Sequence, residues 1–182
     1  MKKKNFIHPV RSSVHSKILT EDFRKEIHFS KTSNGVHPKA NLEGKVKLGK
    51  NISIWAFASI RGDEGKIIIG ENSNIQESVV IHGETKIGKN VTVGHGAIIH
   101  GAKIGNNVLI GANSTILDGV EISDWNIIGA GTLIPPRTKI GKGSVVMGIP
   151  GKIIRKLNKK DKNLITNSYK SYLAKIKNFP KK

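Results

Sequence analysis

Three histidines lie within the stretch "VVIHGETKIGKNVTVGHGAIIHG", which spans residues 79–101. His82 and His100 are 18 residues apart, and each directly follows an isoleucine. His95 lies between them, five residues before His100. Imidazole nitrogens are common ligands of zinc, iron and cobalt, so these residue types suggest metal binding. Their spacing decides which of them can share one ion.

The sequence around the histidines repeats every six residues. Aliphatic residues recur at this step from Val36 to Val146, except for a step of nine between positions 60 and 69 and a step of five between positions 99 and 104. Glycine often follows the aliphatic residue, which indicates a corner in each unit. Because six is a multiple of two, the aliphatic residues keep to one side of a strand, whereas the helical period of 3.6 cannot hold them in phase. Short strands that coil and stack are expected, since one unit cannot bury a face alone.

The pattern resembles the hexapeptide-repeat proteins, whose fold is a left-handed parallel β-helix of triangular cross-section with three hexads per coil. A β-sandwich, the alternative all-β arrangement, has turn signals every eight to twelve residues, and a strict six is too short for that. We therefore predict an all-β protein, with a left-handed parallel β-helix over residues 34–150. Nineteen aliphatic positions at three per coil give a little over six coils. The two irregular steps predict loops that leave the prism.

The two ends of the chain differ from the repeat. Residues 1–33 have no clear period and predict an N-terminal extension, with a short helix near "TEDFRKE". Gly148 and Pro150 mark a change of structure before residues 151–182. That last segment is expected to be helical, as one or two amphipathic helices, because its apolar residues have mostly three- and four-residue spacings. These residues are Ile154, Leu157, Leu164, Ile165, Tyr169, Tyr172, Leu173 and Ile176.

The six-residue period predicts where the histidines lie on the coils. In a three-sided coil, His82 and His100 occupy the same position on successive turns, with their backbones about 4.8 Å apart. Two imidazoles stacked in this way can share one metal ion. Five extended residues span about 16 Å, so His95 cannot reach that ion within the same chain. As a ligand it must come from another subunit, and a closed ring of this kind is a homotrimer with three equivalent sites. The alternative is that the histidines are ordinary surface residues.

A longer segment resembles one particular family of hexapeptide-repeat proteins. The stretch "SIWAFASIRGDEGKIIIGENSNIQESVVIHGETKIGKNVTVGHGAIIHG" resembles the γ-class carbonic anhydrase family. In that family, histidines at the positions of His82 and His100 bind the metal from one subunit, and one at the position of His95 binds it from the next. The short link between His82 and His95 is similar to the branch without an extended acidic loop. The sequence departs from the family at Glu77, where aspartate is common.

The resemblance implies a reaction and a set of site residues. It implies reversible hydration of CO2 to bicarbonate with a divalent metal, zinc first and iron or cobalt as alternatives. Gln76 corresponds to a glutamine that orients the reacting oxygen, Glu64 to a proton relay and Asn74 to a further site residue. Arg61 and Asp63 correspond to a pair that links subunits beside the site. Surface polar residues are the alternative reading of Gln76 and Glu64.

The net charge of +18 is concentrated at the two ends. Residues 1–31 carry a net charge of +5 and residues 152–182 a net charge of +10, which leaves +3 for residues 32–151. A nearly balanced central body argues against nucleic acid as a partner, and charge runs at chain ends usually serve solvation.

The absence of cysteine excludes disulfides, thiolate metal ligands and a cysteine nucleophile. No apolar run approaches the roughly 20 residues that a membrane span needs. The basic start "MKKKNFIHPV" is not followed by the apolar run of a secretory signal. We therefore expect a cytoplasmic protein without a membrane span.

Two other function classes stay open. Many hexapeptide-repeat proteins are acyltransferases that use coenzyme A, and some relatives of the suggested branch are described as acyl-CoA thioesterases. An acyltransferase normally needs one catalytic histidine as a base, not a matched set of three. A non-catalytic, metal-binding scaffold trimer is the third possibility.

Overall fold

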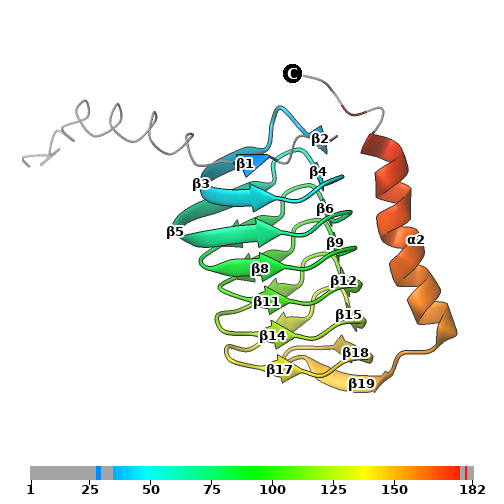
Figure 1. Ribbon diagram of the computed structural model, residues 1–182. Helices are drawn as coiled ribbons and strands as arrows, with labels where there is room; N and C mark the ends of the chain where they lie inside the picture. Colours follow the sequence, from blue (N-terminus) through cyan, green and yellow to red (C-terminus); the bar gives the residue numbers. More distant parts are fainter. Residues whose placement is uncertain (1–27, 30–34, 177–178, 180–182) are drawn as a thin grey trace, which may run out of the picture.

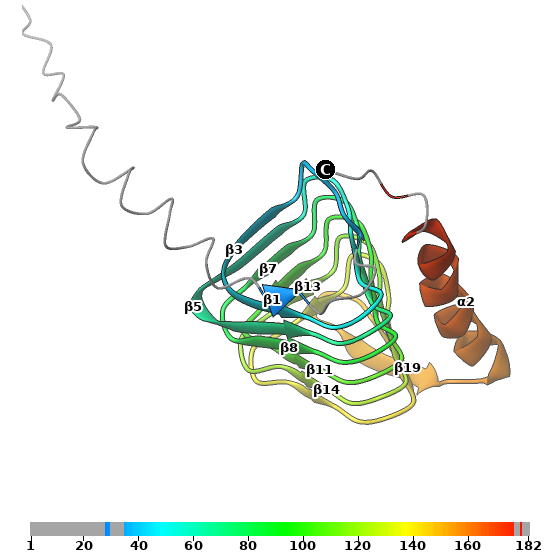
Figure 2. The ribbon, with the colours of Figure 1, turned by 45° about the horizontal axis from the view of Figure 1, so that its top comes forward.

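The computed structural model describes residues 28–29, 35–176 and 179. They form a three-sided prism of stacked parallel strands, with one helix along one side (Figures 1 and 2). The left-handed parallel β-helix expected from the six-residue period is confirmed. The expected N-terminal helix near "TEDFRKE" and most of the N-terminal extension lie outside the described residues.

The strands stack into three faces, here numbered 1 to 3. Face 1 contains the first halves of β3 (Asn41–Leu48) and β5 (Ser59–Ile69), with β7 (Val80–His82), β10 (Ile98–His100), β13 (Thr115–Ile116) and β16 (Leu133–Ile134). Face 2 contains the second halves of β3 and β5, with β1 (His28–Phe29), β8 (Thr85–Ile87), β11 (Lys103–Ile104), β14 (Glu121–Ile122) and β17 (Lys139–Ile140). Face 3 contains β2 (Gly35–Val36), β4 (Ser53–Ile54), β6 (Asn74–Ile75), β9 (Thr92–Val93), β12 (Val108–Ile110), β15 (Asn126–Ile128) and β18 (Ser144–Met147).

The interior of the prism is a stack of aliphatic side chains. The repeated positions from Leu48 to Val146 are all 4% exposed or less, as the period predicts. β-branched isoleucine and valine suit these positions because their restricted side chains pack well on a strand. Burial of one such side chain is favourable by about 1.5–3 kcal/mol. Each coil thus adds its own layer to one continuous core.

The prediction of loops at the two irregular steps is wrong. The step of nine is taken up by β5, a single 11-residue strand that passes from face 1 to face 2. β3 pairs with β5 on both sides of a register shift between Gly44 and Val46, so the extra residues stay within the sheet. The step of five is a shortened corner, in which Gly101 has a φ of 58° and the buried Ala102 precedes β11.

The corner between faces 2 and 3 is built from asparagines. Asn51, Asn72, Asn90 and Asn107 all have φ between 54° and 60°, a left-handed conformation that asparagine tolerates better than most residues. Their side-chain amides form a ladder, in which each donates to the next at 3.0–3.1 Å. The glycines that follow the aliphatic residues have another role. A Cβ on Gly88 would come within 2.5 Å of a carbonyl oxygen of the next coil.

The C-terminal segment contains a strand as well as a helix. β19 (Lys152–Lys156) pairs antiparallel with β18 and ends face 3, so the prediction of helix is wrong there. α2 (Lys159–Ile176) then runs along face 3 (Figure 1). Its buried Ile165 packs with Ile127 and Val145. No helix among the described residues is long and apolar enough to cross a membrane.

The start of α2 is fixed by a reciprocal cap. Asn158 Oδ1 accepts from the backbone N–H of Asp161, and Asp161 Oδ2 accepts from the backbone N–H of Asn158. Arg155 on β19 donates to both carboxylate oxygens of Asp161. These bonds, the Arg155 fork first and the backbone N–H of Asn158 second, lower the pKa of Asp161 to about 2. The cap therefore ties the helix to the last strand of the prism.

Candidate metal centre

Two of the three histidines meet where face 1 ends. His82 ends β7 and His100 ends β10, and the two residues are direct partners in the parallel pairing. His82 Nδ1 lies 3.1 Å from His100 Nε2. Two nitrogen ligands of one tetrahedral zinc ion, each about 2.0–2.1 Å from it, are about 3.3 Å apart. The spacing therefore fits a shared ion.

Each of these two rings has a carboxylate at its other nitrogen. Asp63 Oδ1 lies 3.1 Å from His82 Nε2, and Asp118 Oδ1 lies 2.7 Å from His100 Nδ1. Histidines that bind metals usually donate their second N–H to a carboxylate, a carbonyl or water, which fixes the ring. The donor set and its surroundings therefore suit a divalent metal.

Arg61 completes this corner. Its Nη2 lies 3.0 Å from Asp63 Oδ2 and 3.2 Å from His82 Nε2. Partial burial raises the pKa of Asp63, but the hydrogen bond and charge of Arg61 outweigh it, so the pKa is lowered overall. The same hydrogen bond raises the pKa of Arg61. Asp63 is therefore held as an anion between a cation and an imidazole.

The long strand β5 also brings Glu64 to the histidine pair. Glu64 Oε2 lies 3.7 Å from His82 Nε2, and ligand atoms of Glu64, His82 and His100 all lie within 4.8 Å of one another. The Glu64 side chain is 66% exposed and so reaches solvent. The nine-residue step in the repeat thus positions Arg61, Asp63 and Glu64 together.

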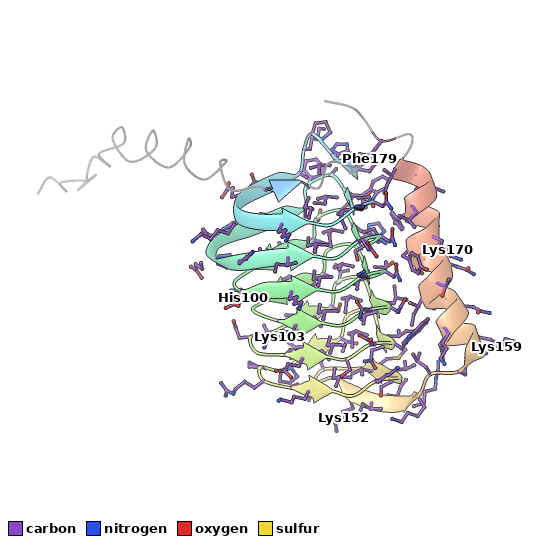
Figure 3. The ribbon with its side chains drawn as sticks, in the orientation of Figure 1. His100, Lys103, Lys152, Lys159, Lys170 and Phe179 are labelled. Atoms are coloured by element: carbon purple, nitrogen blue, oxygen red, sulfur yellow. The ribbon has the colours of Figure 1, made fainter. Side chains whose placement is uncertain are left out.

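His95 lies at the opposite end of face 1, between β9 and β10. The structure does not bring it to the other two histidines. Its Nδ1 lies 2.8 Å from Glu77 Oε2, one coil earlier, and its side chain is 58% exposed. Figure 3 labels His100 on the side of the prism away from α2, which carries Lys159 and Lys170.

Gln76 and Asn74 belong to the His95 end, not to the His82 end. Gln76 directly precedes Glu77, and its Nε2 donates to Asn74 Oδ1 at 3.1 Å. Asn74 is in turn buried and donates to Thr92 on the next coil at 2.9 Å. Gln76 follows Ile75 as His82 follows Ile81, so the two share a hexad position, but Gln76 comes after β6 on face 3 and His82 ends β7 on face 1. A shift of six residues moves a side chain to the next face, and only 18 residues return it to the same face.

Two acidic residues were missed from the sequence as histidine partners. Asp118 follows His100 by 18 residues, and Glu77 precedes His95 by 18 residues. The interval that joins His82 to His100 would have found both. Glu77 also lies near the helix, since burial first and the charge of Glu77 second raise the pKa of Tyr172 on α2.

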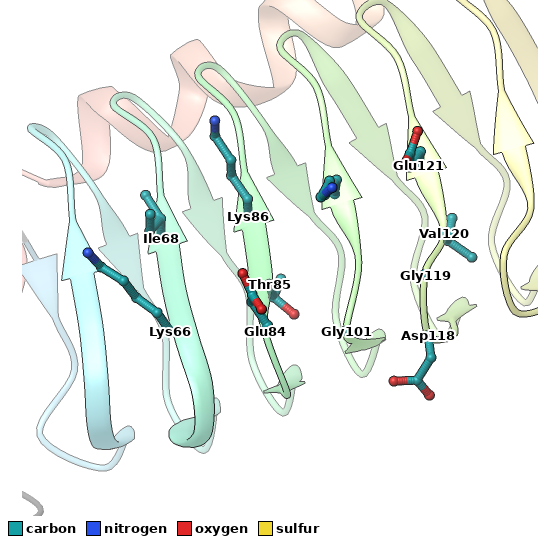
Figure 4. Close-up of a pocket in the computed structure, with 11 residues that line it drawn as sticks. Lys66, Ile68, Glu84, Thr85, Lys86, Gly101, Asp118, Gly119, Val120 and Glu121 are labelled. Carbon is teal, nitrogen blue, oxygen red and sulfur yellow. The ribbon is translucent and has the colours of Figure 1, made fainter.

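A cavity of about 460 Å³ lies on the outer surface of face 2 (Figure 4). It is lined by residues of β5, β8, β11 and β14 and of the corner before β14. Asp118, the partner of His100, lies on its wall. Its charged residues have both signs, with Lys66, Lys86 and Lys103 beside Glu84, Asp118 and Glu121.

Comparison with known sequences gives short matches to several hexapeptide proteins. A family model described as bacterial transferase hexapeptide (six repeats) matches residues 101–136, and one described as hexapeptide repeat of succinyl-transferase matches residues 84–107. The carboxysome assembly protein CcmM of Nostoc sp. is 55% identical over 49 residues, 26% of this chain and 9% of that protein.

Two further curated proteins match at similar length. Carnitine operon protein CaiE of Escherichia coli O157:H7 is 44% identical over 50 residues, 28% of this chain and 26% of that protein. Carbonic anhydrase of Methanosarcina thermophila is 44% identical over 48 residues, 26% of this chain and 19% of that protein. The matched segments therefore span only about a quarter or less of these curated relatives.

Solved structures give longer matches. A hexapeptide transferase family protein from Anaplasma phagocytophilum is 31% identical, with 85% of this chain and 97% of that chain covered and a TM-score of 0.74. A candidate acetyltransferase from Bacillus cereus is also 31% identical, with 86% and 94% covered and a TM-score of 0.83. Since both similarities extend over most of both chains, this protein belongs to the hexapeptide transferase family, with its left-handed β-helical fold.

Proposed function

We propose that this protein is a metalloenzyme like the γ-class carbonic anhydrases, which hydrates CO2 reversibly to bicarbonate. The main support is the His82–His100 pair, whose facing nitrogens are 3.1 Å apart and whose outer nitrogens each contact a carboxylate. A divalent metal bound there supplies a Lewis acid that lowers the pKa of water towards about 7. Zinc is the first expectation, with iron or cobalt as alternatives.

The third ligand in this proposal is His95 of a neighbouring subunit. The His82–His100 pair and His95 lie at opposite ends of face 1. Between them, face 1 exposes Val80 and Ile98, which pair on adjacent coils and are 39% and 42% exposed. Exposed apolar neighbours favour a protein contact. If the His82–His100 end of face 1 in one subunit meets the His95 end in the next, the subunits can close into a ring. This arrangement supports a homotrimer.

The remaining residues divide between the two ends of the face. Gln76 and Asn74 accompany His95, and an amide such as that of Gln76 can both donate to and accept from substrate oxygen atoms. Glu64 accompanies His82, and its exposed carboxylate can pass a proton to solvent. Arg61 and Asp63 hold the His82 ring and the corner of β5.

The decisive experiment combines metal analysis with CO2 hydration. We expect about one zinc ion per chain in the native protein. His82→Ala and His95→Ala should each remove it, whereas His37→Ala, which changes a histidine that contacts Lys39 and Phe179, should not. Stopped-flow hydration should exceed the buffer rate with zinc or with anaerobically loaded ferrous iron. Metal content that survives both of the first two substitutions would overturn the proposed site.

Acyl transfer or acyl-CoA hydrolysis is the second candidate. The candidate acetyltransferase from Bacillus cereus favours it, as does the cavity of about 460 Å³ on face 2. Small-molecule sites commonly have volumes of about 300–1,000 Å³, far more than CO2 needs. Turnover of acyl-CoA without CO2 hydration would select this function. Bound metal without either activity would select a non-catalytic scaffold, the role that the name of the Nostoc assembly protein suggests.

A further inference from the structure

Two histidines of the proposed site have an ionisable carboxyl group as the described partner of Nδ1. Asp118 Oδ1 lies 2.7 Å from His100 Nδ1, and Glu77 Oε2 lies 2.8 Å from His95 Nδ1. We propose that Asp118 and Glu77 are positioning residues, which hold His100 and His95 with the proton on Nδ1 and leave Nε2 free for the metal. This inference rests on the proposed metal site and names the residues that prepare it.

The tautomer follows from hydrogen-bond chemistry. A carboxylate can only accept, so an imidazole that bonds to it must donate. A neutral imidazole carries one N–H, and a proton on Nδ1 leaves a lone pair on Nε2. In His100, that Nε2 is the atom 3.1 Å from His82 Nδ1. The carboxylate therefore selects the form of His100 that can accept from His82 or bind a metal.

The two pairs share the same spacing at the two ends of face 1, although only His100 and Asp118 form a hydrogen bond, and His95 and Glu77 are in close charge contact. Glu77 lies one coil before His95 and Asp118 one coil after His100, so each carboxylate is carried by a neighbouring turn of the prism. His82 differs, because its outer nitrogen lies near both Arg61 and Asp63. Its tautomer is therefore not fixed by a carboxylate alone. The proposal is therefore limited to Asp118 and Glu77.

One carboxylate oxygen of Glu77 is buried beside His95. Its Oε2 is the oxygen at 2.8 Å from the ring, and the same atom is buried although the side chain is partly exposed. A buried carboxylate oxygen needs a donor, since leaving it unpaired is costly. No hydrogen bond reaches Oε2 among the described residues, but His95 Nδ1 lies 2.8 Å from it, so a small rotation of the imidazole would supply the donor. A hydrogen bond formed in this way would occupy Nδ1 of His95 and leave its Nε2 for the metal.

The test uses the full-length protein with Asp118→Asn and Glu77→Gln, which keep the side-chain shape and remove the carboxylate. Zinc affinity is measured by competition with a chelator. Each variant should bind zinc about 10–100-fold more weakly, the usual effect of removing such a partner. Glu121→Gln and Glu71→Gln serve as matched controls, because these acids contact Lys139 and Lys89 and, in the described part of the chain, no histidine. Both controls should keep the native affinity.

A second readout does not need metal. Two-bond proton–nitrogen correlation spectra of the metal-free protein report which nitrogen of each imidazole carries the proton. His95 and His100 should be protonated on Nδ1 in the native protein. This preference should be lost for His95 in Glu77→Gln and for His100 in Asp118→Asn, and Glu77→Asp should restore it in part.

The two readouts separate the inference from the proposed function. If the native protein binds no zinc, the proposed function fails, and the tautomers alone decide the inference. If zinc binds but both variants keep the native affinity and tautomers, the positioning role is refuted while the metal site stands. Selective loss of affinity and of the Nδ1 proton in the variants, but not in the controls, supports it.

Discussion

His82 and His100 are direct partners on adjacent parallel strands, and their rings meet edge to face, with centroids 5.1 Å apart and planes at 68°. This arrangement points one nitrogen of each ring at the other instead of stacking the rings. The pair thus offers two nitrogens to one position, which is half of a tetrahedral site. The remaining ligands have to come from outside the pair, either from His95 of a neighbouring subunit or from Glu64 of the same chain.

The exposed apolar residues Val80 and Ile98 on face 1 provide a test of the trimer. Ile98→Lys should convert the protein to monomers, because an unpaired charge in a buried contact costs several kcal/mol. Metal should be lost with the trimer, since His95 would no longer reach the His82–His100 pair. Sedimentation velocity and metal analysis measure both effects. Ile153→Lys, at another exposed isoleucine on β19, is the matched control and should stay trimeric. A trimeric Ile98→Lys protein with full metal content would count against the arrangement.

Glu64 can be a proton relay or a metal ligand. As a relay, Glu64→Gln should retain its metal and lose about 10²-fold in kcat at low buffer concentration, the lower range for general acid–base catalysis. Added imidazole buffer should restore part of the rate. Loss of metal in this variant would instead show that Glu64 completes a site within one chain, as its place within 4.8 Å of both histidines permits.

The asparagine ladder makes a prediction about stability. Asn90 has a φ of 57° and bonds to asparagines above and below it. Asn90→Ala should lower the free energy of unfolding by about 1–2 kcal/mol for the left-handed conformation, and by more for the lost bonds. Asn90→Gly keeps the backbone conformation and loses only the bonds. Denaturant unfolding should therefore rank native above glycine above alanine, and a more stable alanine variant would contradict this account.

The cap of α2 predicts a pH dependence. The pKa of Asp161 is lowered to about 2 in the folded protein, so its ionised form stabilises the fold at pH values above its ordinary pKa. That contribution should disappear as the pH falls through about 2. Asp161→Asn lacks it at every pH, so thermal unfolding of the two proteins should converge between about pH 5 and pH 2. A constant difference in Tm across this range would contradict the assignment.

The sequence was sufficient for the fold because the period of six directly encodes which side chains face inward. Ile81 and Ile99 are buried for that reason, and the 18-residue interval to the next coil places His82 beside His100. The same arithmetic separates His95 from that pair. These features follow from the number of residues per hexad and per coil, and no single contact is needed to predict them.

Other features depend on partners that a single sequence does not show. The extra residues before Ile69 stay in β5 because β3 lies alongside and pairs with them. Ile153 and Ile154 form a strand, not a helix, because the edge of β18 is free to pair, and a short apolar run is compatible with either structure. Gln76 belongs to the His95 end because six residues separate it from His82, which is one face and not one coil.

The prism also limits how this protein can change in length. Each coil contacts mainly the coils before and after it, and the His82–His100 pair occupies two neighbouring coils. Adding or removing one complete coil beyond Thr115 would leave that pair and its spacing unchanged, although α2 would have to shift along face 3. An insertion of another length within the strands would turn every later side chain towards a different direction. Natural length variants of this protein should therefore differ by whole coils, or by extra residues that stay within paired strands, as those around Asp63 do in β5.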